Sequence, residues 1–185
     1  MRSVRGLGVP LLIVLSFAVS ANAQTIVATG GSPLPVTRGM TIGQAIQALK
    51  PELQTYVLEP DSGWFLQIHE NGSYEDIPLT LWSDDCQDYV INYSAKVNIV
   101  TLHSEKYRTR EGVHVGMLLK DVEKKLGKLK KIYTSEPTFE QYAVFEKMPP
   151  SVSFAVFGGI LEDSQRETQR YSPDAKIAKI SISFY

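Results

Sequence analysis

Two short stretches of the chain place apolar residues at the spacing of one helix face. The positions are Ile42, Ala45 and Leu49 in the first stretch and Leu119, Val122 and Leu126 in the second. This i, i+3, i+7 spacing predicts a short amphipathic helix in each stretch. Thr41 and Gln44 form a capping-box pattern at the first helix, which Pro51 ends. The second helix has Leu118 in place of that cap, and Gly127 suits its C-terminal end.

After each helix the apolar period changes from helical to two, which predicts antiparallel strands. The predicted strands of the first half are residues 64–69, residues 77–82 and two strands within residues 89–103. Those of the second half are residues 140–146, 152–157 and 176–185. Asn71-Gly72 is a hairpin signal, and the polar residues 158–173 are expected to form a loop.

The two halves also match each other in sequence. An offset of 77 superposes Gly39-Met40 on Gly116-Met117, and an offset of 80 superposes residues 95–101 on residues 175–181. The repeat predicts an α+β fold of two tandem units, each a helix followed by an antiparallel meander. Because one small sheet with one helix is marginally stable, we expect the units to share one larger sheet, with both helices on one face.

The first 23 residues have the pattern of a secretory signal peptide. Arg2 and Arg5 precede an apolar run, and Ala21-Asn22-Ala23 is a small-residue cleavage site. We therefore expect a periplasmic or secreted protein whose mature chain starts at Gln24. The expected division of the chain is a signal peptide (1–23), an irregular lead-in (24–36), a first repeat unit (37–107) and a second repeat unit (108–185).

Charge and cysteine content narrow the choice of partner. Cleavage removes two arginines and no acid, which changes the formal net charge from −1 to −3. This mild acidity argues against nucleic acid as a partner, and no later stretch is apolar enough to span a membrane. Cys86 is the only cysteine, so no internal disulfide forms. It is either a thiol that pairs with another chain or a small, partly buried apolar residue.

We find no sequence pattern for a catalytic nucleophile, an acid–base pair or a cofactor, and expect a protein that is not an enzyme and needs no cofactor or metal. Asp84, Asp85 and Asp88 are either calcium ligands or a solvated acidic loop, and their spacing is not that of an EF-hand. The lysines between Lys120 and Lys131 either form a patch for anionic lipid or glycan, or complement the C-terminal end of the second helix.

Candidate partner-binding residues follow from the alternation along the predicted strands. Those expected on the face of the sheet away from the helices are Phe65, Gln67, His69, Trp82 and Tyr142. Aromatic side chains exposed on a sheet are typical anchors for a protein partner, unless a loop or the lead-in covers them. We therefore expect an envelope protein that binds another protein as an assembly or inhibitor-type module. The alternative is a carrier of a small apolar ligand or lipid, held in a cavity between sheet and helices.

The second helical stretch also carries a family motif. The matching residues are Gly116, Met117, Val122, Leu126 and Gly127. In this motif the chain resembles the BamE-type (SmpA/OmlA) outer-membrane assembly lipoproteins, which have one copy of the unit. The period of 77 residues resembles the tandem-repeat fold of the β-lactamase inhibitor protein. Small σE-regulated envelope lipoproteins of unknown function are similar in arrangement.

The resemblance covers most of residues 37–185 and implies a binding or assembly protein with this tandem fold. Two features depart from these families. The inhibitor has structural disulfides, whereas Cys86 stands alone. The lipoproteins begin with a lipidated cysteine, whereas the expected mature chain begins with Gln24.

Overall fold

The computed structural model describes residues 27–28, 36–49, 54–58, 64–69, 79–83, 92–136, 139–160 and 166–185. The expected signal peptide, the Asn71-Gly72 turn, the acidic loop at Asp84 and Cys86 lie outside these residues. The described part is an α+β fold in which two helices pack on one large antiparallel sheet. None of its helices has the length and apolar character that crossing a membrane requires.

The large sheet has nine strands in the order β10-β7-β8-β9-β11-β5-β4-β3-β2. Their bounds are β2 (Gln54–Leu58), β3 (Trp64–His69), β4 (Leu79–Ser83), β5 (Ile99–Leu102), β7 (Leu129–Thr134), β8 (Gln141–Phe145), β9 (Val152–Gly159), β10 (Glu167–Thr168) and β11 (Tyr171–Ser183). Every neighbouring pair is antiparallel. The strands of the first half of the chain therefore form one side of the sheet, and those of the second half form the other.

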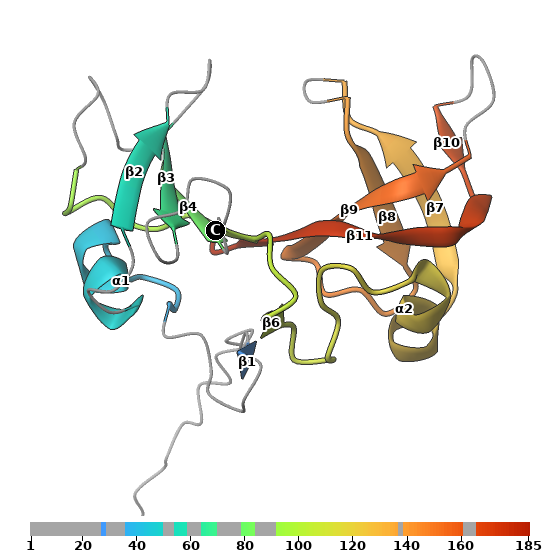
Figure 1. The fold of residues 1–185 in the computed structure, drawn as a ribbon, viewed down its shortest axis with the longest axis horizontal. Coiled ribbons are helices and arrows are strands. Elements are labelled where there is room, and N and C mark those ends of the chain that lie inside the picture. Colours follow the sequence, from blue (N-terminus) through green and yellow to red (C-terminus); the bar gives the residue numbers. More distant parts are fainter. Residues whose placement is uncertain are drawn as a thin grey trace, which may run out of the picture.

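The two sides of the sheet meet where β5 pairs with β11, which we call the seam. The paired residues are Leu102 with Ile180, Thr101 with Ser181, Val100 with Ile182 and Ile99 with Ser183. β11 pairs with β9 from Tyr171 to Ile182, and its last residues also pair with β5. In Figure 1 this long strand runs from the second half to the middle of the molecule.

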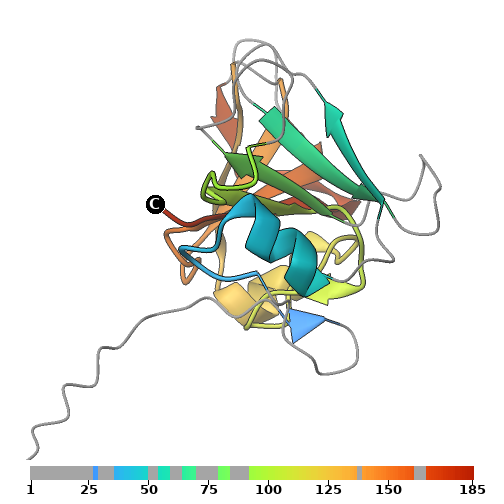
Figure 2. The ribbon, with the colours of Figure 1, turned by 90° about the vertical axis from the view of Figure 1, so that its left-hand side faces the viewer.

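Both helices lie on the same side of the sheet (Figures 1 and 2). They are α1 (Ile42–Leu49) and α2 (Leu119–Leu126). The predicted capping box is present, because the Gln44 amide donates to Thr41 Oγ1 and the Thr41 amide donates to Gln44 Oε1. Gly127 ends α2 with φ of 78°, and a Cβ there would lie 2.7 Å from the Glu146 carboxylate. Only glycine fits this turn without strain.

The core fills the space between the helices and the sheet. α1 contributes Ile42 and Ala45, and α2 contributes Leu119, Val122 and Leu126. The sheet contributes alternate residues of its central strands, including Leu81, Val100, Phe154, Ile180 and Ile182. The predicted alternation of the last strand is confirmed, since Ile180 and Ile182 are buried and their neighbours are less so. The other side of the sheet, opposite the helices, is called the open face below.

The expected irregular lead-in is wrong at two residues. Val27–Ala28 form a strand, β1, that pairs with β6 (Tyr107–Arg108) in a small separate sheet. This places the lead-in beside the segment that connects the two halves, below the large sheet in Figure 1. The expected boundary between the units, after residue 107, falls inside β6.

Three strand predictions also need correction. β2 and β7 were not expected, although each follows its helix directly and forms a hairpin with the next strand. Of the two strands expected within residues 89–103, the described part contains only β5, because residues 92–95 turn back toward α1. The loop expected at residues 158–173 contains the end of β9, all of β10 and the start of β11.

Candidate functional site

A row of short polar side chains crosses the middle of the open face. Cross-strand pairing runs from Gln67 to Thr80, Thr101, Ser181 and Ser153, on five neighbouring strands. Paired residues in an antiparallel sheet point to the same face. Thr80 and Thr101 are only 7% and 8% exposed, although no helix covers this face in the described part of the chain. Short hydroxyl side chains thus form a shallow floor between larger neighbours.

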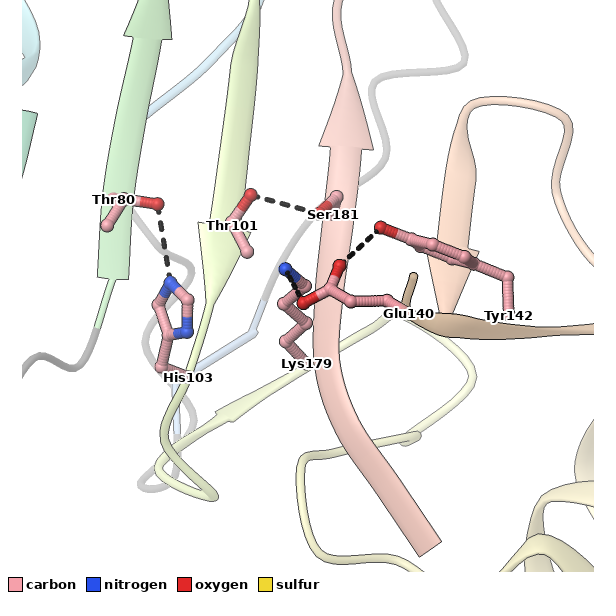
Figure 3. A network of polar contacts seen from close by, with 7 residues as sticks. All are labelled: Thr80, Thr101, His103, Glu140, Tyr142, Lys179 and Ser181. Atoms are coloured by element: carbon pink, nitrogen blue, oxygen red, sulfur yellow. Dashed lines mark hydrogen bonds and ion pairs between the residues drawn. The ribbon is translucent and has the colours of Figure 1, made fainter. Parts of the chain in front are cut away.

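Hydrogen bonds tie this floor together, as Figure 3 shows. The hydroxyls of Thr101 and Ser181 lie 2.9 Å apart and join the two strands of the seam. The Thr80 hydroxyl lies 3.3 Å from Nε2 of His103, the residue that follows β5. Burial lowers the pKa of His103 below its ordinary value of 6.5, and the positive charge of Lys179 lowers it further. The neutral imidazole is therefore favoured beside Lys179.

Lys179, Glu140 and Tyr142 form a charged group next to the polar row. Lys179 Nζ lies 2.6 Å from Glu140 Oε1, and the Tyr142 hydroxyl donates to Glu140 Oε2 at 2.8 Å. Burial raises the pKa of Glu140, but the hydrogen bonds from Lys179 and Tyr142 outweigh it and hold the pKa below the ordinary 4.5. Glu140 is thus a fixed negative charge at neutral pH. In Figure 3 Lys179 lies between it and His103.

A pocket of about 330 Å³, called the aromatic hollow here, lies beside this group. Its lining residues are Thr134, Phe139, Glu140, Gln141, Ala155, Val156, Phe157, Gly158 and Ala178. Phe139 is 82% exposed and Phe157 is 64% exposed, so both rings lie largely in solvent. Ala155 and Ala178 are small, which leaves the space between the rings open. This volume is at the lower end of the range for ligand pockets.

The local backbone holds this hollow in shape. Phe139 has φ of 53°, a left-handed conformation that is uncommon for a bulky residue and typical of functional sites. Gln141 donates to the Gly159 carbonyl and accepts from the Gly159 amide, at 3.2 and 3.0 Å. Gly158 has φ of 92°, and a Cβ on it would clash with Ser172 and Ala175. The turn before β8 and the end of β9 are therefore fixed relative to each other.

The residues predicted from sequence fall into two groups. Phe65 pairs with Trp82, and Gln67 pairs with Thr80, on β3 and β4. His69 pairs with Gln54 on β2, at the far edge of the sheet. Trp82 and Gln67 are half-buried, and the side chains of Phe65 and His69 are outside the description. These four lie in the first half.

Tyr142 lies in the second half, separated from β4 by β5, β11 and β9. It is half-buried and stacks on Tyr133, with ring centroids 5.8 Å apart. Its neighbours in the charged group and the aromatic hollow were not predicted. Phe157 follows the alternation of Ser153 and Ala155 along β9, which was a usable signal. Phe139 had none, since it lies in a turn.

The site has features of a binding surface. Exposed rings around a small floor can receive an apolar group, and the charged group beside them can orient it. Within the described residues, no three His, Cys, Asp or Glu side chains gather closely enough to hold a metal ion.

Comparison with known proteins shows the fold. The chain is similar to the crystal structure of the uncharacterized protein yfeY from Escherichia coli, with a TM-score of 0.56 and 11% sequence identity. The match covers 81% of this chain and 94% of the yfeY chain. No protein-family model matches the sequence, and no curated protein matches it. At this identity the likeness concerns architecture alone.

Proposed function

We propose that this protein is an exported bacterial envelope protein that binds another protein through the open face. The observation that supports this most strongly is the pair of exposed rings, Phe139 and Phe157, around the aromatic hollow. Large aromatic side chains in solvent are unfavourable for an isolated chain, and they commonly become anchors in an interface. The fixed charges of Glu140 and Lys179 beside them would set the orientation of the partner.

The open face suits a partner better than the helix side does. Between helices and sheet the space is filled by fully buried side chains such as Phe145, Phe154 and Leu126. A carrier of the expected type would hold its ligand there. The aromatic hollow favours a second candidate function, the binding of a small apolar ligand on the open face, because its volume admits one.

We also infer that the fold consists of two copies of one unit. α1 and α2 are both eight residues long and start 77 residues apart. The Val97 amide donates to the Met40 carbonyl, and the Ile177 amide donates to the Met117 carbonyl, both at 2.9 Å. These contacts correspond at offsets of 80 and 77. Isolated bridges between Thr41 and Lys96 and between Leu118 and Lys176 correspond in the same way.

The seam gives this repeat a two-fold arrangement. Thr101 and Ser181 are equivalent at the offset of 80 and pair with each other. The flanking pairs, Leu102 with Ile180 and Val100 with Ile182, exchange under the same offset. A two-fold axis through the Thr101–Ser181 hydrogen bond would relate the halves. The proposed kinship with the β-lactamase inhibitor and BamE-type families rests on this repeat and on the motif at residues 116–127.

Export through cleavage after Ala23 is part of the proposal, because the signal pattern lies in residues 1–23, outside the described part. N-terminal sequencing of protein from the envelope fraction tests it. A chain that starts at Gln24 supports export, and an intact Met1 on a membrane-embedded species contradicts it.

Photocrosslinking tests the binding face. We expect a photoreactive phenylalanine at position 157 to give a defined protein adduct in the native envelope. The matched control is position 93, because Tyr93 is also an exposed aromatic, 58% exposed, but does not line the hollow. An adduct with a small apolar molecule at position 157 supports the second candidate. Equal adducts at both positions contradict a binding site at the hollow.

A further inference from the structure

A group of exposed lysines surrounds the C-terminal end of α2, on the side of the molecule opposite the open face. We call it the basic cluster; its members are Lys120, Lys124, Lys125, Lys128 and Lys147. The first three lie on α2, and Lys128 follows it. The Lys147 amide donates to the Leu126 carbonyl at 2.8 Å, which brings Lys147 to the helix end. Leu119, Val122 and Leu126 turn the other face of α2 into the core.

The acidic residues nearby are largely occupied by other partners. Glu123 accepts from the Leu129 amide at 2.8 Å and from the Tyr171 hydroxyl at 2.7 Å. Glu146 accepts from the Lys128 amide at 3.1 Å. In the described part of the chain the cluster has one ion pair, between Lys124 and Asp121 at 2.7 Å. The remaining four lysines therefore present their charge to solvent.

Positive charge is concentrated in this region of the sequence. Residues 105–131 contain nine lysines and arginines against four aspartates and glutamates, whereas the whole chain has 19 against 20. The rest of the chain is consequently acidic. A helix C-terminus favours some positive charge, but a few lysines in the last turn satisfy it. An excess of this size and placement favours an extended anionic partner.

The form of the cluster indicates which anion it suits. Its lysines are exposed and spread around a helix end, rather than converging in a pocket as they would on a single phosphate. The large exposed apolar residues of the described part, such as Phe139 and Phe157, lie elsewhere. Contact with a partner here is therefore electrostatic and involves no inserted apolar group.

We propose that the basic cluster docks the protein on the surface of an anionic phospholipid bilayer. The helix side then faces the bilayer, and the open face is turned away from it. A protein partner can bind the open face while the cluster is engaged. Each lysine near an anionic surface contributes about fivefold in affinity, and the attraction falls with salt over about one Debye length.

Vesicle sedimentation tests this inference. The protein is the chain from Gln24, because the apolar run of residues 1–23 would itself bind lipid. We expect it to sediment with vesicles of phosphatidylglycerol and phosphatidylethanolamine, and to be released by high salt. Vesicles of phosphatidylcholine should leave it in solution.

Charge variants locate the contact. Lys125→Gln with Lys128→Gln should weaken binding about 25-fold, since two lysines are lost. The matched control is Lys96→Gln with Lys176→Gln, which removes the same charge from exposed lysines outside the cluster. It should weaken binding less than threefold. All four positions are exposed, so thermal unfolding should be unchanged in both variants.

Three outcomes overturn the inference. Equal losses in the two double variants would mean that overall charge, and not the cluster, attracts the bilayer. Binding to phosphatidylcholine with the same affinity would exclude an anionic headgroup. Retention on a sulfated polysaccharide that depends on the cluster, without binding to the phosphatidylglycerol vesicles, would assign the cluster to an anionic glycan.

Discussion

At the scale of single residues, the open face combines side chains that are held in place with side chains that are not. Glu140 and Lys179 are fixed by their mutual contact, whereas Phe139 and Phe157 have most of their surface in water. The first pair can be tested through its ionisation, and the rings can be tested through binding. Stability and binding should therefore respond to different substitutions.

Phe157→Ala should leave the melting temperature nearly unchanged, because the side chain is 64% exposed. Capture of the partner should nonetheless fall about thirtyfold, which is the loss typical of an aromatic anchor. Thermal unfolding and a quantitative binding assay measure the two effects. Tyr93→Ala is the control and should change neither. A large loss of stability in Phe157→Ala would show that the ring packs against the fold and does not serve as a free anchor.

Lys179→Met should raise the pKa of Glu140. The hydrogen bond from Lys179 and its charge now hold that pKa down, and burial, which acts the other way, would remain. The same substitution should raise the pKa of His103, which the Lys179 charge lowers. Carbon and proton NMR titrations of the two side chains check both shifts. Unchanged titration of both groups would contradict the geometry of the charged group.

His103 should make the fold less stable in mild acid. Its folded-state pKa is depressed below 6.5, so the folded protein binds the proton less readily than the unfolded chain. The stability it contributes is present above pH 6.5 and is lost as the pH falls through the folded-state pKa. Denaturant unfolding at a series of pH values measures the slope. His103→Asn should flatten the profile in this window, and an unaltered profile would rule out the effect.

At the scale of elements, the two helices differ in how they begin and end. α1 starts with a reciprocal capping box, whereas Leu118 gives α2 no side-chain cap. α2 instead ends at Gly127, whose backbone conformation excludes a side chain. Its stability therefore depends more on the core residues of its buried face.

Leu126→Ala should destabilise the fold by about 2–5 kcal/mol, because it empties space in the core at a residue that is 1% exposed. Thr41→Ala should cost about 0.5–2 kcal/mol through loss of the α1 cap. Denaturant unfolding measures both. Lys120→Ala, at an exposed position of α2, is the control and should change stability by less than about 0.5 kcal/mol. A smaller cost for Leu126→Ala than for Thr41→Ala would contradict the packing.

Elements with a strong period could be predicted from the sequence, and others could not. The helices at residues 42 and 119 and the strand at Trp64–His69 follow directly from apolar spacing. β7 was missed because Lys130 and Lys131 interrupt its alternation, and a bulge between Leu129 and Lys131 shifts its register. Such irregularities depend on the neighbouring strand, and the sequence of one strand does not show them.

The same reason limits what could be predicted of the site. The pairing of Phe65 with Trp82 was within reach, because both lie on regular strands. The contact of Glu140 with Lys179 was not, since it depends on a bulge in β11 between Ile177 and Lys179. The conformation of Phe139, outside any strand, gave no periodic signal. The aromatic hollow therefore emerges only from the folded chain.

At the scale of the whole molecule, the nine-stranded sheet depends on the seam. β5 and β11 each have a partner strand in their own half, and the seam adds four residue pairs between them. Cutting the chain into halves would expose one edge of each strand and part of the common core. Small sheets with a single helix are marginally stable alone.

We therefore expect residues 108–185 alone to be largely unfolded, and to fold when residues 24–107 are added. Near-ultraviolet circular dichroism and amide NMR spectra measure the change. The full chain is the reference for the folded signal. A second half that gives dispersed amide signals without the first would show that the unit is stable by itself and that the seam is not required.

The floor of the aromatic hollow has a consequence for how the two halves diverged. Trp82 pairs with Ile99 on β5, and Ala155 pairs with Lys179, which corresponds to Ile99 at the offset of 80. In a duplicated fold, Trp82 and Ala155 therefore descend from one ancestral position. One half kept or gained a large ring there, and the other has a methyl group that leaves room for a guest. Selection on the two halves would then differ: the first constrained to fill that position, the second to keep it empty.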